Sequence, residues 1–177
     1  MSKINAQGAA LTIACLMPEL KDMAVGERPF AASLRAAAAE AADALGDCDE
    51  PTPTGWTISE AFHAVLYLSV TCDNKVTREE REQAVALVQG SRLLQSLSPE
   101  RLSEIKRKVA ERVRYETGVL KPVCATLRKD MRLPTFAKAL DIILSDGEIT
   151  QDEADFLNTL MLRFELVGEQ VGRVAKV

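Results

Sequence analysis

Two short acidic stretches decide the fold of this chain. Residues 146–153 read DGEITQDE, and residues 73–80, which lie 73 positions upstream, read DNKVTREE. Each stretch begins with Asp, continues with a residue that tolerates a left-handed turn (Gly or Asn), and ends in a Thr-x-x-Glu capping box. Each stretch therefore predicts the end of one helix, a tight acidic turn and the start of a second helix.

The segments around the two stretches also match each other. When residues 61–94 are placed beside residues 134–166, Asp73 falls on Asp146, Thr77 on Thr150 and Glu80 on Glu153. Each unit is an apolar helix, an acidic turn and a second apolar helix, so we expect two related helical hairpins around a common core. Val76 and the matching Ile149 are expected to bury their side chains under the turns.

Helical periodicity dominates the remaining sequence, and strand-like alternation is not evident. We expect one continuous helix over residues 78–95 and a second that begins after Ser98-Pro99 and ends near Gly118. A seam in the second helix holds Leu102, Ile105, Val109 and Val113. A short helix is expected over residues 122–131, and a strongly apolar one is expected to start at Pro134. The predicted fold class is all-α.

The first 55 residues differ from the rest of the chain. Residues 30–45 are rich in Ala and predict a helix, whereas residues 46–55 (GDCDEPTPTG) are typical of an exposed linker. Residues 9–17 (AALTIACLM) have the length of a signal-peptide core, but the flanking residues favour a helix that packs on the domain. We therefore expect a helical extension and linker over residues 1–55 and a helical domain over residues 56–177.

Composition limits the class of protein and its location. The 177 residues carry a net charge of −4, and 47% of them are hydrophobic, which is ordinary for a globular domain. The four cysteines are scattered without a CxxC motif, so reduced thiols in the cytoplasm are expected. No apolar run approaches the ~20 residues that a membrane-spanning helix needs.

The acidic residues of the two turns allow two interpretations. Glu80 and Glu153 can act as capping-box residues and nothing more, each worth roughly 1 kcal/mol. Alternatively, the carboxylates bind a divalent cation, because hard cations prefer several oxygen ligands. An EF-hand is rejected, because Ile142 and Leu144 stand where its first oxygen ligands would have to be.

The same residues give the chain a resemblance to a known family. A helix that ends in Asp-Gly-Glu-Ile, a further helix that starts with an acidic cap, and a degenerate upstream copy resemble the TerB-like domain of tellurite-resistance proteins. The resemblance covers about residues 56–171. It implies an internally duplicated helical bundle of a bacterial cytoplasm that serves stress-response assemblies.

The resemblance also implies a metal site where the two hairpins meet. Carried over position by position, the metal-binding residues would be Asp73, Glu80, Asp146, Glu148 and Glu153, and the cofactor a divalent ion such as Ca²⁺. The sequence departs from the family at Asn74-Lys75, where a second Asp-Gly is usual, and Lys75 places a cation beside the proposed site. The alternative function is a protein-interaction module whose acidic turns are only helix caps.

No catalytic motif is found in the sequence. His63 is the sole histidine, and because it matches Phe136 in the repeat it is expected to be a packing residue rather than a base. Nucleophile motifs, zinc-protease motifs and phosphate-binding loops are absent from the sequence. We therefore expect a protein that is not an enzyme.

Basic residues are concentrated in one part of the chain. Residues 101–132 hold ten basic and four acidic side chains, which gives this stretch a positive charge within an acidic protein. Such a stretch can attract an anionic surface or an acidic protein partner. The simpler interpretation is a solvated helix face with internal ion pairs such as Glu104–Lys108. Nucleic acid is not expected, because Tyr115 alone is available for base stacking there.

Overall fold

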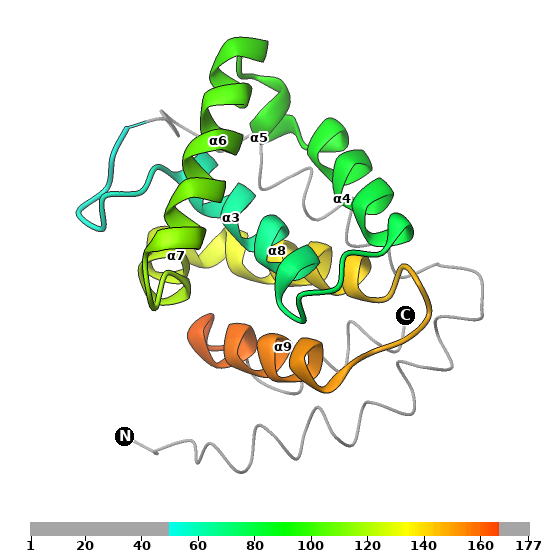
Figure 1. Cartoon of the computed structure of the whole chain (residues 1–177). Helices are drawn as coiled ribbons and strands as arrows, with labels where there is room; N and C mark the ends of the chain where they lie inside the picture. Colours follow the sequence, from blue (N-terminus) through cyan, green and yellow to red (C-terminus); the bar gives the residue numbers. More distant parts are fainter. Residues whose placement is uncertain (1–49, 167–177) are drawn as a thin grey trace, which may run out of the picture.

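The computed structural model describes residues 50–166, in which all regular structure is helical (Figure 1). The seven helices of this region are α3 (Ile58–Thr71), α4 (Arg78–Gly90), α5 (Arg92–Gln95), α6 (Pro99–Tyr115), α7 (Leu120–Thr126), α8 (Lys129–Ile143) and α9 (Gln151–Arg163). The all-α prediction is confirmed for this part of the chain. The expected helices over residues 9–17 and 30–45 lie outside the described residues.

Helix α3 is the centre of the fold. It packs against α4, α6, α7 and α8, and nine of its fourteen residues are buried. Its sequence explains this position, because apolar or small residues occur on all sides of the helix rather than along one stripe. Helix α9 packs against α7 and α8 on the other side of α8 from α4 (Figure 1).

The amphipathic helix α6 covers one face of α3. Ile105 and Val109 are fully buried, and Leu102 and Val113 flank them as half-buried residues, so the predicted seam is confirmed. Ser98 caps this helix by accepting a hydrogen bond from the Arg101 backbone at 3.2 Å. The opposite face of α6 is charged and meets solvent.

Three helix boundaries differ from the sequence prediction. The short helix expected over residues 122–131 is α7, which ends at Thr126, and Met131 belongs to the next helix. The helix expected over residues 78–95 is broken at Ser91, whose ψ of 115° is extended. Because glycine has a low helix propensity, ending the helix at Gly90 costs little free energy. The change of direction allows Leu93 and Leu94 to be buried in the core. Helix α8 begins at Lys129, so Pro134 lies inside it rather than at its start. Burial of Met131 in the core favours this earlier start over the local preference of proline.

The end of the expected linker is attached to the domain. The Thr52 hydroxyl donates to the Trp56 carbonyl at 2.8 Å, and Thr54 hydrogen-bonds Thr126 of α7. Trp56 is fully buried, and the Arg112 guanidinium lies 3.6 Å from the centre of its ring. Within residues 50–166, no helix has the length and apolar character needed to cross a membrane.

Candidate functional site at the two acidic turns

The two acidic turns have the same backbone hydrogen bonds. The Asp73 carboxylate accepts from the Lys75 backbone N–H at 2.8 Å, and Asp146 accepts from the Glu148 N–H at 3.0 Å. The residue after each aspartate has a positive φ, 61° at Asn74 and 85° at Gly147. The left-handed turns expected from Asn and Gly are therefore present in both copies.

Both turns lead into complete capping boxes. The Glu80 Oε2 atom accepts from the Thr77 backbone N–H at 2.9 Å, and the Glu153 Oε2 atom accepts from the Thr150 N–H at 2.7 Å. In the second bond of each box, the threonine hydroxyl oxygen accepts a hydrogen bond from the glutamate backbone N–H. In each box the capping bonds use Oε2, so Oε1 of each glutamate remains outside the box.

Glu80 and Glu153 meet each other in the interior. The exposed fraction of Glu80 is 2% and that of Glu153 is 3%. The two side chains lie close enough to interact, and two buried carboxylates with no cation between them repel each other when both are ionised. The pKa of Glu153 is raised to about 7, mainly by burial and to a smaller extent by the neighbouring Glu80.

A third capping box, at the start of α3, has a different electrostatic arrangement. Glu60 caps Thr57 in the same way, with its Oε2 atom 3.0 Å from the Thr57 backbone nitrogen, and it is fully buried. Its Oε1 atom, however, accepts from Lys108 Nζ at 2.6 Å. The Glu60 oxygen that takes no part in capping, Oε1, is thus paired with a cation. Among the described residues, no basic side chain is paired with Glu80 or Glu153.

Cys72 and Asp73 lie close to the glutamate pair. Burial, and then the negative charges of Glu153, Asp73 and Glu80, raise the pKa of the Cys72 thiol to about 12. The thiol is therefore neutral at physiological pH and is a poor nucleophile. Asp73 is only half-buried, so its carboxylate is more accessible to solvent than those of the pair.

The other predicted metal-binding residues are more distant from the pair. Asp146 and Glu148 are exposed at the tip of the second turn, and within the described region neither is hydrogen-bonded or ion-paired to Glu80 or Glu153. Lys75 is also exposed and forms no ion pair with described residues. The structure therefore joins Glu80 with Glu153, places Asp73 near them, and leaves Asp146 and Glu148 at the surface.

The donor set suits a hard, hydrated cation better than a closed cage of protein ligands. Two carboxylates and their outer oxygens match the chemistry of Mg²⁺, which keeps several waters and is bound by one or two carboxylates. Residues 50–166 hold no group of three or more His, Cys, Asp or Glu side chains arranged to hold a metal ion. Among the described residues, an ion at the Glu80–Glu153 pair would therefore have to be bound by fewer than three of these side chains.

One expectation about the turns is wrong. Val76 was expected to be buried like Ile149, but 43% of its surface is exposed, whereas Ile149 is half-buried against the core. The first turn packs less deeply because Val76 points into the open cavity between α3 and α4 rather than under its own turn.

The basic stretch over residues 101–132 is largely neutralised by ion pairs. Six of its ten basic residues contact an acidic side chain: Arg101, Arg107, Lys108, Arg112, Arg128 and Arg132. The expected Glu104–Lys108 pair does not form, because Lys108 turns inward to Glu60 and Glu104 pairs with Arg101 at 2.7 Å. This arrangement favours the solvated helix face over a docking surface for an anionic partner.

The sequence did not indicate two of these contacts. The Lys108–Glu60 pair links residues 48 positions apart, and the contact between Glu80 and Glu153 depends on how the hairpins pack. The Thr-x-x-Glu pattern of residues 57–60 is typical of a capping box, but it does not indicate that Glu60 is buried or that Lys108 is its partner. Comparisons of the chain with models of protein families, with curated proteins and with solved structures found no match. The function is therefore inferred from the geometry of the chain itself.

Proposed function

We propose that this protein is a non-enzymatic helical domain that binds one divalent cation at the Glu80–Glu153 pair. In this proposal the hairpins α3–α4 and α8–α9 form a duplicated bundle of the tellurite-resistance TerB-like kind, which serves a stress-response assembly. The cation supplies positive charge between two buried carboxylates, which otherwise have to share a proton. Asp73 adds a nearby oxygen, and Asp146 and Glu148 add negative potential at the surface.

The difference between the three capping boxes carries this proposal. All three glutamates are buried and all three use Oε2 for the cap, but within residues 50–166 only Glu60 has a cation at Oε1. Burying a carboxylate without a positive partner is costly, so an arrangement of two such carboxylates in contact favours uptake of a cation or a proton. A divalent ion satisfies both groups at once and uses hard oxygen ligands as such ions prefer.

Thermal unfolding of the full chain tests the proposal. We expect millimolar Mg²⁺, Ca²⁺ or Mn²⁺ to raise the melting temperature of the native protein, because an ion that binds only the folded state stabilises it. Glu80→Gln and Glu153→Gln should abolish the shift while keeping the caps, since a glutamine oxygen still accepts the capping bonds.

Matched controls come from the same helical turns. Glu79→Gln and Asp152→Asn remove one exposed carboxylate each, next to Glu80 and Glu153 respectively, and should leave the ion-induced shift intact. If the native protein shows no shift with any of these ions, the metal proposal fails. A shift of equal size in all four variants would locate the ion elsewhere and contradict the assignment to the pair.

A second candidate function is a protein-interaction module whose acidic turns are purely structural caps. The observation that favours it is the completeness of the capping boxes, in which threonine and glutamate satisfy each other's backbone N–H groups in both turns. On this hypothesis the proton shared by Glu80 and Glu153 is all that the pair requires. The absence of ion-induced stabilisation in the experiment above would select this function.

A further inference from the structure

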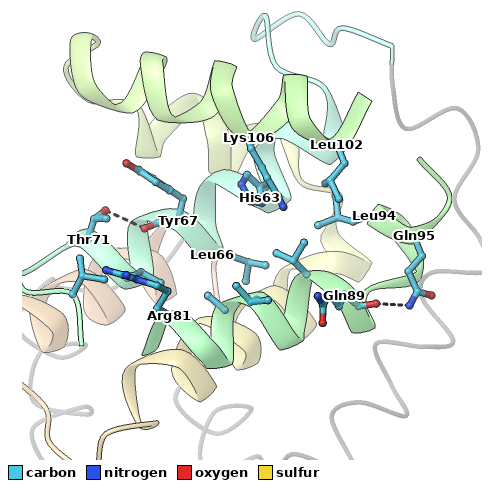
Figure 2. Close-up of a pocket in the computed structure, with 15 residues that line it drawn as sticks. His63, Leu66, Tyr67, Thr71, Arg81, Gln89, Leu94, Gln95, Leu102 and Lys106 are labelled. Carbon is cyan, nitrogen blue, oxygen red and sulfur yellow. Dashed lines mark hydrogen bonds between the residues drawn. The ribbon is translucent and has the colours of Figure 1, made fainter. Parts of the chain in front are cut away.

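A cavity of about 650 Å³ lies on the face of the domain opposite α9, bounded by α3, α4, α5 and α6 (Figure 2). Its size falls within the roughly 300–1,000 Å³ that is usual for small-molecule sites. Val76 of the first acidic turn lines it, but neither Glu80 nor Glu153 does. An inference about this cavity therefore does not depend on the metal proposal.

The walls of the cavity are mainly aliphatic. Leu66, Val88 and Leu94 line its interior, and Val76 and Val85 lie at its edge. Exposed fractions of 43% for Val76 and 51% for Val85 place both among the few large apolar side chains that the described part of the domain leaves open to solvent. Apolar surface that is left uncovered in this way is typical of a binding site.

The charges around the cavity have one sign. Arg81 on α4 and Lys106 on α6 both line it, and no Asp or Glu is among the described lining residues. Neither cation is ion-paired within residues 50–166, in contrast to most basic residues of α6. The cavity thus joins an aliphatic interior to a positive rim, which is complementary to an aliphatic anion.

His63 places a buried polar atom at the same cavity. It is 8% exposed, and its Nδ1 atom is buried without a hydrogen-bond partner among residues 50–166. The positive charge of Lys106 acts on the imidazole, and Figure 2 shows the two side chains close together where α3 faces α6. Burial, and then Lys106, lower the pKa of His63 to about 4, so the ring is neutral and carries one N–H. Buried polar atoms are normally satisfied, so this nitrogen indicates a missing partner.

We propose that this cavity binds a fatty-acid anion, with the carboxylate held by Lys106 and His63 and the alkyl chain lying along Leu66, Val88 and Leu94. The Lys106 ammonium provides the charge, and the His63 imidazole donates its N–H to a carboxylate oxygen. Arg81 lies across the cavity from these two residues and adds to the positive potential (Figure 2). The alkyl chain covers the apolar surface that Val76 and Val85 leave exposed.

Nuclear magnetic resonance of the full chain gives a direct test, because His63 is the sole histidine and its ring signals are unambiguous. Adding dodecanoate below its micelle concentration should shift the His63 ring signals in a saturable way. Affinity should rise about threefold to fourfold for each methylene between octanoate and dodecanoate, as expected for a chain that is buried. Dodecylamine, with the same chain and the opposite charge, should not bind at these concentrations.

Variants with matched controls assign the contacts. By calorimetry, Lys106→Gln should weaken dodecanoate binding about threefold to tenfold, whereas Lys121→Gln, another exposed lysine that does not line the cavity, should not change it. Val85→Glu should abolish binding, because it places a negative charge at the rim. Leu162→Glu alters another exposed apolar residue, on α9, and should leave binding unchanged.

Four results would overturn the proposal. The first is the absence of any His63 shift with millimolar dodecanoate, and the second is equal binding of dodecylamine. The third is a set of nuclear Overhauser contacts between the His63 ring and residues 1–49 in the free protein, which would make the chain's own segment the occupant. The fourth is a response to phosphatidylglycerol vesicles without a response to free dodecanoate, which would make the site a membrane contact.

Discussion

The side chains of Glu80 and Glu153, which are 73 residues apart in the sequence, are both buried and interact with each other in the interior of the domain. Each comes from the first turn of a helix, and each also caps the helix to which it belongs. The contact therefore connects the starts of α4 and α9, and with them the two acidic turns. We therefore expect the protonation state of the two carboxylates to affect the stability of both turns.

Stability should fall as the pH rises through the pKa of this pair. Burial and the neighbouring Glu80 raise the pKa of Glu153 from 4.5 to about 7 in the folded protein. Because the folded state holds this proton more tightly, the stabilising contribution is complete below about pH 4.5 and is lost as the pH rises through about 7. We expect a decrease of about 1–3 kcal/mol in the free energy of unfolding between about pH 5 and pH 8, measured by urea denaturation in the absence of divalent ions. A stability that rises or stays level over this range would contradict the shared proton.

Glu153→Gln should stabilise the ion-free protein at alkaline pH. The glutamine oxygen keeps the capping bonds, and its amide nitrogen donates permanently to Glu80 where the native pair would be ionised. We expect a gain of about 1 kcal/mol at about pH 8 and no gain at about pH 5 in urea denaturation. Glu153→Ala removes the capping side chain as well and should cost about 1 kcal/mol. Equal losses in both variants at pH 8 would mean that Glu153 acts only as a cap and gains nothing from neutralisation.

Lys108→Met should be strongly destabilising although it changes a side chain on an exposed face. It leaves the fully buried Glu60 without its cation, which we expect to cost about 2–4 kcal/mol in thermal or urea unfolding. Adding Glu60→Gln should recover most of this loss, because the variant then buries no uncompensated charge. Arg107→Met, which breaks the exposed pair with Glu111, is the matched control and should cost less than about 0.5 kcal/mol. A small effect of Lys108→Met would show that Glu60 is neutralised in another way.

Gly147→Ala should destabilise the second turn, whereas Asn74→Gly should not destabilise the first. The φ of Gly147 is 85°, and an added Cβ would meet no atom within 4 Å, so the cost arises from the backbone conformation alone. We expect a loss of about 1 kcal/mol for Gly147→Ala and a change within about 0.5 kcal/mol for Asn74→Gly. Chemical denaturation of both variants checks this pair, and a neutral Gly147→Ala would mean that the turn adopts another conformation.

Local patterns in the sequence predicted the local structure well. The Thr-x-x-Glu motifs of the two acidic stretches predicted two capping boxes, and each is present with both of its hydrogen bonds. The left-handed turns at Asn74 and Gly147 and the buried seam of α6 were also predicted, because they depend on residues a few positions apart. Capping and amphipathic periodicity are short-range effects, so one sequence contains the information needed to predict them.

Features that depend on packing between distant segments were missed. The break at Ser91 and the helical position of Pro134 follow from the need to bury Leu94 and Met131, which local preference does not reveal. The exposure of Val76 results from the cavity between α3 and α4, which no motif in the sequence marks. The partners of Glu60 and Glu153 likewise come from other elements of the fold.

Isothermal calorimetry of the full, ion-free chain with Mg²⁺ or Mn²⁺ near pH 7 tests the central claim most directly. Titration in buffers of different ionisation enthalpy gives the number of protons released with each ion bound, since metal binding displaces protons from its ligands. The account predicts one ion per chain, with release of up to about one proton, and the loss of both signals in Glu80→Gln and Glu153→Gln. Binding without proton release, binding that survives in both variants, or no heat at millimolar ion would contradict it.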